Sequence, residues 1–119
     1  MRYLGIVGFI AVLAGCATAP VEDGYLERAT AAIERATDAQ APEHAPLELR
    51  FAREKLVAAQ AAHDDKAYAA AARLAEQCEI NATLAIARSQ AAQARKKTRS
   101  MRDQNEKLKQ DLETESGSK

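Results

Sequence analysis

The sequence predicts an all-α protein: a helical hairpin, or a three-helix antiparallel arrangement, whose long C-terminal helix extends beyond the bundle. Apolar residues and alanines recur at spacings of three and four, which is the helical period. Alanine, the best helix former, supplies 26 of the 104 residues from Cys16 onward, whereas large apolar side chains are few. The core is therefore expected to be thin, so that oligomerisation would help to stabilise it.

The first fifteen residues have the parts of a secretory signal. Arg2 gives a positive start, and residues 3–12 form an apolar run that is too short to span a membrane. Residues 13–16 resemble the lipobox of bacterial lipoproteins, in which a Leu and two small residues precede the lipidated Cys. The resemblance implies acyl chains on Cys16; the alternative is an ordinary secretory signal that leaves this thiol free. The residues it implies for signal peptidase recognition are Leu13, Ala14 and Gly15.

Residues 1–15 are thus expected to be a signal peptide and residues 16–24 a lipidated tether. Two or three acyl chains anchor a protein stably without a spanning helix. In enterobacterial lipoproteins an Asp after the lipidated Cys retains the protein in the inner membrane, and this chain has Ala17 there. The resemblance therefore implies an outer-membrane location that faces the periplasm, with the inner membrane as the alternative.

Residues 25–94 are expected to form an alanine-rich helical domain. Its first helix covers about residues 25–39, and Pro42 and Pro46 bracket a breaker. Pro46 can open a second helix that runs to about residue 63. The expected core faces are Leu26, Ala29, Ile33, Ala36 and Gln40 in the first helix, and Leu49, Ala52, Leu56 and Ala59 in the second.

The third helix is expected to run from Lys66 to about Glu113, because neither Gly nor Pro interrupts this stretch. Asp64 or Asp65 is expected to be its N-cap, in a turn short enough to make the last two helices antiparallel neighbours. At 1.5 Å per residue it would reach about 70 Å, so the second helix can cover only its first third. A heptad seam of small residues is formed by Ala71, Ala75, Cys78, Ala82, Ala85, Ser89 and Ala92.

The hairpin resembles a domain-of-unknown-function family of periplasmic bacterial lipoproteins, which is often found ahead of OmpA-like peptidoglycan-binding domains. The resemblance implies a helical fold and an envelope location, but no catalytic residues. This chain departs from the family in lacking a glycine in the hairpin turn and an OmpA-like domain after it. The residues that carry the resemblance are Ala45, Pro46, Leu49, Ala52, Lys55, Leu56, Ala59, Tyr68, Ala71, Leu74, Ala75, Cys78, Ala82, Leu84 and Ala85.

Composition argues against several classes of function. Lys and Arg number 17, as do Asp and Glu, and aromatic residues make up 4%, so we expect no nucleic-acid binding. The sequence offers no catalytic triad and no phosphate-binding glycine loop, and we expect no enzyme. His63 beside Asp64 and Asp65 lacks a clear fourth ligand, and His44 lies between two prolines, so no metal site is expected. The acyl chains on Cys16 are the only prosthetic group expected.

Cys78 is the one thiol left once Cys16 is acylated. Its place in the alanine seam favours a buried packing role. The alternative is a disulfide between two copies that meet at this seam.

Residues 95–119 are expected to form a charged helical extension with a frayed tail. Opposite charges four residues apart, as in Arg102 and Glu106, support an exposed helix. A basic run in this extension is either a solvated helix face or a surface for anionic lipid, lipopolysaccharide or cell wall. Its residues are Arg95, Lys96, Lys97, Arg99 and Arg102.

The sequence as a whole predicts a membrane-anchored periplasmic structural or adaptor lipoprotein that presents a long helix to a protein or cell-wall partner, with homo-oligomerisation also expected. An alternative is a small helical binding module, or chaperone-like holder, for an apolar ligand or partner helix. A minority hypothesis concerns the terminal Lys119. It resembles the peptidoglycan-linked lysine of the major outer-membrane lipoprotein family of enterobacteria, which implies a covalent tether to peptidoglycan.

Overall fold

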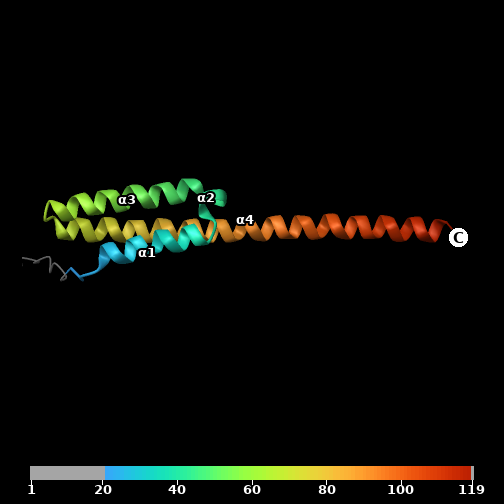
Figure 1. Ribbon diagram of the computed structural model, residues 1–119, viewed down its shortest axis with the longest axis horizontal. Helices are drawn as coiled ribbons and strands as arrows, with labels where there is room; N and C mark the ends of the chain where they lie inside the picture. The colour runs from blue at the N-terminus through green and yellow to red at the C-terminus, as the bar shows by residue number, and fades with distance from the viewer. Residues whose placement is uncertain (1–20, 119) are drawn as a thin grey trace, which may run out of the picture.

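A computed structural model describes residues 21–118, and in this part of the chain all regular structure is helical. α1 (Tyr25–Asp38) and α3 (Pro46–Asp64) lie along the first half of α4 (Tyr68–Gly117), and the second half of α4 continues alone (Figure 1). The predicted all-α fold with a projecting C-terminal helix is confirmed, in its three-helix form. None of the helices in residues 21–118 combines the length and the apolar character needed to cross a bilayer. The helices are α1 (Tyr25–Asp38), α2 (Ala41–His44), α3 (Pro46–Asp64) and α4 (Tyr68–Gly117).

α1 and α4 run in the same direction, and α3 runs opposite to both. Residues later in α1 contact residues later in α4: Ala29 meets Cys78, and Ala39, just after α1, meets Ser89. α3 contacts α1 through His63 and Tyr25, which lie at opposite ends of their helices. The described chain therefore begins at the same end of the bundle as the α3–α4 turn, and the C-terminus lies at the far end of α4 (Figure 1).

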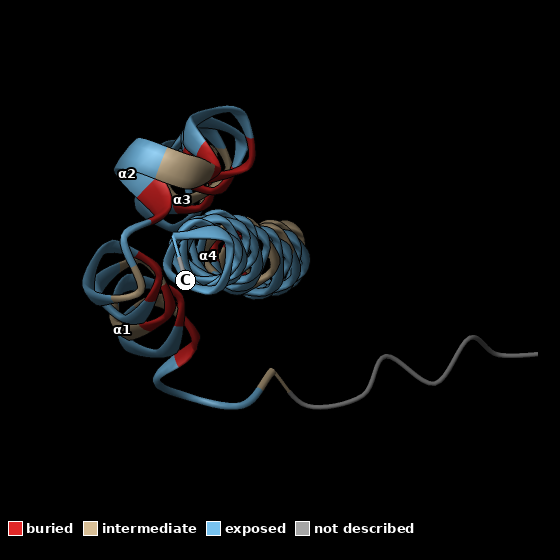
Figure 2. Ribbon diagram, turned by 90° about the vertical axis from the view of Figure 1, so that its right-hand side faces the viewer, coloured by how far each residue is buried: buried red, intermediate tan, exposed pale blue. Residues whose placement is uncertain are grey.

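Alanine forms most of the core. Figure 2 shows the buried residues of α1 and α3 on the sides that face α4. The predicted seam of α4 is buried from Ala71 to Ser89, whereas Ala92 is half-buried where the bundle ends. Cys78 Sγ lies 3.7 Å from the backbone oxygen of Ala29, which shows how closely small side chains let the two helices approach. The seam is thus covered within one chain, by α1 on one side and α3 on the other.

The core face of α1 differs from the predicted one. Ala29 and Ala36 are buried as expected, but Leu26 and Ile33 are only half-buried, and Gln40 is exposed and lies beyond the helix. Tyr25 and Ala32 are buried in addition. Large branched side chains cannot enter the close contact that the alanines make with α4, so they pack along its edge.

The α3–α4 turn needs no glycine. α3 ends at Asp64, and Lys66 adopts the left-handed conformation with φ 61°. The backbone nitrogen of Ala67 donates to the oxygen of Ala62 at 2.8 Å, and that of Lys66 donates to His63 at 2.9 Å. These two bonds form a Schellman motif, in which glycine usually holds the left-handed position. The N-cap of α4 is Ala67 rather than Asp64 or Asp65, because both aspartates are used to end α3.

The segment predicted as a breaker, residues 40–46, contains the one-turn helix α2. Gln40 has φ 62° and turns the chain away from α1, and Pro42 lies in the first turn of α2. Proline is tolerated there because the first turn leaves its backbone nitrogens without helical acceptors. α2 contacts α4 as well as α3, so it closes the end of the bundle from which α4 emerges.

Candidate functional site

The point where α4 leaves the bundle is fixed by polar contacts to the end of α1. The Ser89 hydroxyl is buried and donates to the backbone oxygen of Ala39. Gln93 Nε2 donates to the same oxygen and to Ser89 Oγ, each at 3.1 Å. Side chains of α4 thus satisfy a carbonyl that the end of α1 leaves without a helical donor.

An ion pair ties α3 to α4 near the same end. Arg88 Nη1 donates to Glu48 Oε1, and the Glu48 side chain is almost fully buried. A buried carboxylate needs such a partner, because removal from water disfavours its charge. Arg88 is therefore committed to the bundle, unlike the cations that follow it on α4.

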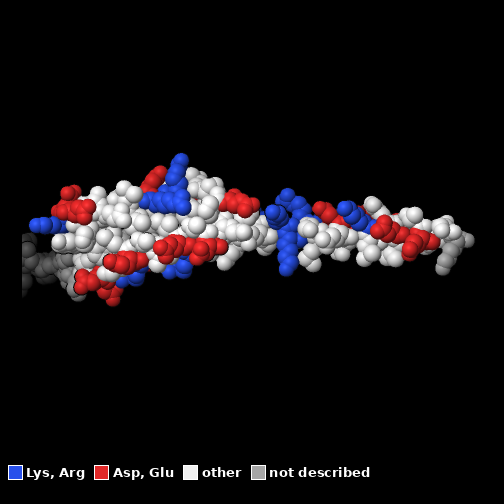
Figure 3. Space-filling view, viewed as in Figure 1, with Lys and Arg blue, Asp and Glu red and all other residues white. Residues whose placement is uncertain are grey.

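The five predicted basic residues form what we call the basic collar, a band on α4 just beyond the bundle (Figure 3). All five residues are exposed to solvent. None of them forms an ion pair within 4.0 Å of an acidic group in residues 21–118, so the predicted pair of Arg102 with Glu106 is not formed. Five unpaired cations within eight positions create a local field that attracts anions. The members of the basic collar are Arg95, Lys96, Lys97, Arg99 and Arg102.

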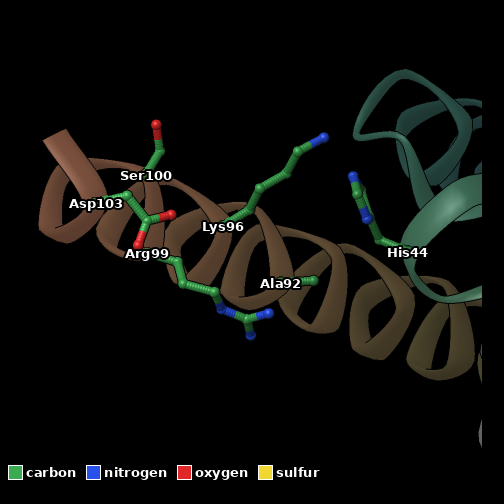
Figure 4. Close-up of a pocket in the computed structure, with 6 residues that line it drawn as sticks. All are labelled: His44, Ala92, Lys96, Arg99, Ser100 and Asp103. Atoms are coloured by element: carbon green, nitrogen blue, oxygen red, sulfur yellow. The ribbon is translucent and has the colours of Figure 1, made fainter. Parts of the chain in front are cut away.

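A shallow hollow lies where α2 meets the basic collar (Figure 4). The His44 ring from α2 and the Lys96 side chain reach into the space between the two helices. Arg99, Ser100 and Asp103 continue its wall along α4. The hollow is open, so it suits a contact with another macromolecule better than the enclosure of a small molecule.

Cys78 lies in the interior. It is fully buried, and its thiol donates to the Ala29 backbone oxygen at 3.7 Å. Burial raises the pKa of the Cys78 thiol, and the Glu79 carboxylate adds to the rise. A neutral buried thiol is a poor nucleophile, and this geometry suits packing. A disulfide between two copies at this position would require α1 to move off α4.

Three aromatic rings meet at the opposite end of the bundle. The Tyr25 hydroxyl lies 2.6 Å from His63 Nδ1, and the Tyr68 ring meets the His63 ring edge-on. Burial raises the pKa of the Tyr25 phenol, with Tyr68 as the next cause. Val21 and Asp23 line a small hollow with these rings, so the start of the described chain is packed against this end.

The structure brings together only part of the predicted site. The basic collar forms one band, and His63 binds Tyr25 rather than Asp64 or Asp65. In residues 21–118 no group of three His, Cys, Asp or Glu side chains is placed to hold a metal ion. The predicted lipidation and signal residues 13–16 and the terminal Lys119 lie outside the described residues.

The sequence reasoning missed the contacts made by Tyr25, Ser89 and Gln93. Their partners are 38 to 54 residues away, and no local pattern signals such pairs. A usable signal was present for Ser89 alone, because a polar residue in an alanine seam must find an acceptor once it is buried.

Comparison with known protein families places this chain beside one that has no assigned function. A family described as "Domain of unknown function (DUF4398)" matches residues 24–101, which is about two thirds of the chain. The match covers the whole bundle and most of the basic collar, and it ends within the exposed part of α4. No curated protein and no solved structure matches this chain.

Proposed function

Because this chain belongs to the DUF4398 family, whose function is unknown, we propose a role from its own geometry. The protein is a lipid-anchored structural or adaptor protein of the bacterial envelope, and it presents the second half of α4 to a protein or cell-wall partner. The anchor is the acylated Cys16, and the location is the periplasmic face of the outer membrane.

The observation that carries this proposal is the bare half of α4. Residues 94–117 are helical and exposed throughout, and α2 approaches only their start, where His44 and Lys96 line a shared hollow. At 1.5 Å per residue they extend about 36 Å beyond the bundle. A helix exposed on all sides gains no burial energy within its own chain, and a partner that contacts it would supply that burial.

The direction of the helices supports a partner away from the anchoring membrane. The described chain begins beside Tyr68, at the end of the bundle opposite the basic collar. Arg95 is 27 residues along α4 from Tyr68, or about 40 Å. At physiological salt, screening largely removes electrostatic attraction between charges more than about 8–10 Å apart. With the anchor at Cys16 and α4 upright, the basic collar acts on a protein or cell-wall partner rather than on the lipid that holds the chain.

The alternative role as a holder of apolar ligands receives less support. The alanine seam that would form its groove is buried from Ala71 to Ser89 under α1 and α3. The hollows along the basic collar are open, and cationic side chains such as Arg95, Lys96 and Arg99 stand in their walls.

The covalent tether through Lys119 remains the minority hypothesis. α4 ends at Gly117, about 75 Å from its start, so the end of this helix lies far from the proposed anchor. Covalent attachment predicts that the protein stays with purified peptidoglycan after boiling in detergent. A Lys119→Arg variant should then be released.

Metabolic labelling with palmitate tests the anchor. The wild-type chain should take up label and fractionate with the outer membrane. A Cys78→Ala variant should behave identically, because its thiol is buried in the bundle. A Cys16→Ala variant should remain unlabelled, and incorporation of label into this variant would contradict the proposal.

Site-specific photocrosslinking in cells tests the presented helix. A photoreactive residue at Arg99 or Leu112 should give adducts with an envelope protein or with the cell wall. The matched control is Val57, which is 65% exposed on α3 but belongs to the bundle. Adducts from Val57 with none from the two α4 positions would contradict the adaptor role.

A further inference from the structure

The bare half of α4 carries an apolar stripe that the bundle does not use. Six residues follow each other at spacings of four, three, four, three and four, which is the spacing of coiled-coil core positions. Met101, Leu108 and Leu112 are 54%, 59% and 57% exposed, although such side chains gain from burial. We call these six residues the outer stripe: Ala94, Thr98, Met101, Asn105, Leu108 and Leu112.

The outer stripe is not a continuation of the buried seam. At 3.6 residues per turn, it is rotated by about 140° from the face that carries Ala82, Ala85 and Ser89. The outer stripe therefore begins a second contact surface on the same helix, aimed in a different direction from α1 and α3.

The positions that flank the outer stripe are mainly basic, whereas the remote side of the helix carries both signs of charge. The positions beside a coiled-coil core hold Arg95, Lys97, Arg102 and Lys109, with Asp111 as the one acid. Asp103 and Glu106 lie on the remote side of the helix. Ala94 and Thr98 share a hollow with Arg95 and Arg102, so the apolar and basic surfaces are contiguous.

We propose that the outer stripe binds an amphipathic helix of another protein, with apolar core positions flanked by acidic side chains. The proposal rests on the adaptor role above and names the chemistry of its partner. Opposite charges at the flanking positions set partner choice in coiled coils. Asn105 at a core position would fix the register by pairing with a polar residue of the partner.

A second copy of this chain fits the surface poorly. In a parallel pair, Lys97 of one copy faces Arg102 of the other. In an antiparallel pair, one flank brings together Arg95, Arg102 and Lys109, which are all basic, and the other brings together Lys97, Gln104 and Asp111. Each self-pairing places like charges together on at least one flank, and an acid-flanked helix places opposite charges there.

Titration with two synthetic peptides tests the proposal on the full-length lipidated protein in detergent micelles. Each peptide has three heptads with Ile and Leu at the core and one core Asn placed to meet Asn105. One peptide carries Glu at all flanking positions, and the other carries Lys. Fluorescence anisotropy should show saturable binding of the Glu peptide and a Kd at least about tenfold weaker for the Lys peptide.

A pair of variants separates specific docking from general attraction. Leu108→Glu puts a charge into the outer stripe, whereas Gln110→Glu puts the same charge on the remote face. Leu108→Glu should raise the Kd for the Glu peptide by at least about tenfold, and Gln110→Glu should leave this Kd within about twofold of the wild-type value. Equal loss in both variants would show mere charge attraction and overturn the proposal.

Two further outcomes would also overturn it. One is equal affinity for the two peptides, or no binding of either. The other is a dimer in sedimentation velocity that Leu108→Glu dissociates, because the occupant would then be a second copy. The peptide titration can fail while palmitate still labels Cys16 and Arg99 still gives crosslinked adducts. In that case the adaptor role stands, but its partner is not an acid-flanked helix.

Discussion

Residues 68–93 and residues 94–117 of α4 form one continuous helix, but different interactions hold the two regions. In the first region, buried small residues face α1 and α3, and tertiary packing maintains the helix. In the second, every residue is exposed, and the helix depends on intrinsic propensity and on continuation of a helix already nucleated. The comparison teaches that the first region serves the fold, which leaves the second free to serve a partner.

The sharpest way to break this comparison is to truncate a leucine in each part of the molecule. Leu49 is 1% exposed in the bundle, and Leu108 is 59% exposed on the outer stripe. Leu49→Ala should lower the free energy of unfolding by about 2–5 kcal/mol, because it leaves a cavity. Leu108→Ala should change it by less than about 0.5 kcal/mol. Urea denaturation followed by circular dichroism measures both, and comparable losses would refute the division.

Enlarging alanines sharpens the comparison within α4 itself. Ala82 is fully buried in the seam, whereas Ala94 is exposed just beyond the bundle. Ala82→Leu should cost about 1–3 kcal/mol, because its extra carbons must push α1 or α3 away. Ala94→Leu should remain within about 0.5 kcal/mol of wild type. A seam that accepts leucine without loss would mean that α4 is less tightly packed than described.

The boundary between the two regions can be weakened at Ser89. Ser89→Ala removes the hydroxyl that donates to the Ala39 oxygen and leaves the Gln93 amide as the remaining donor. We expect a loss of about 1 kcal/mol in unfolding free energy. Ser100→Ala, a matched change on the bare half, should have no measurable effect. Equal midpoints of thermal unfolding for the two variants would contradict the assigned role of Ser89.

The smallest effect is expected from relieving strain in the α3–α4 turn. Lys66 holds a left-handed φ of 61°, which costs a residue with a Cβ about 1–2 kcal/mol. Lys66→Gly should therefore stabilise the bundle by a net of about 0.5–1 kcal/mol, after the added flexibility of the unfolded chain. Lys66→Ala serves as the control and should give no such gain, since it keeps the Cβ. A destabilised glycine variant would refute the Schellman ending.

Much of the fold was predictable because helical period and chain breakers are local properties. The heptad spacing correctly identified the buried face of α4 from Ala71 to Ser89, and Pro46 opens α3 as expected. The side chains that would fill the core were harder to predict. Size usually favours burial of Leu26 and Ile33, but close helix approach buries Ala32 instead.

The candidate site was predictable only as a cluster of charges. The five cations of the basic collar lie within eight consecutive positions, so the sequence alone predicts that they are close together. Whether a cation of α4 forms an ion pair depends on where the bundle ends. Arg88, next to the last buried seam residue Ser89, still reaches Glu48 of α3, whereas the cations of the basic collar lie beyond this end. The outer stripe can be recognised as a separate face of α4 only by comparing its angular position with that of the buried seam. The seam is defined by its contacts with α1 and α3.

Hydrogen exchange along α4 of the full-length protein tests the central claim most directly. If tertiary packing stabilises the first region but not the second, amides of residues 75–89 should exchange only through global unfolding. Amides of residues 100–115 should exchange orders of magnitude faster, through local fraying that leaves the bundle intact. Equal protection along both regions would contradict the account, because the second half of α4 would then be part of the cooperative fold.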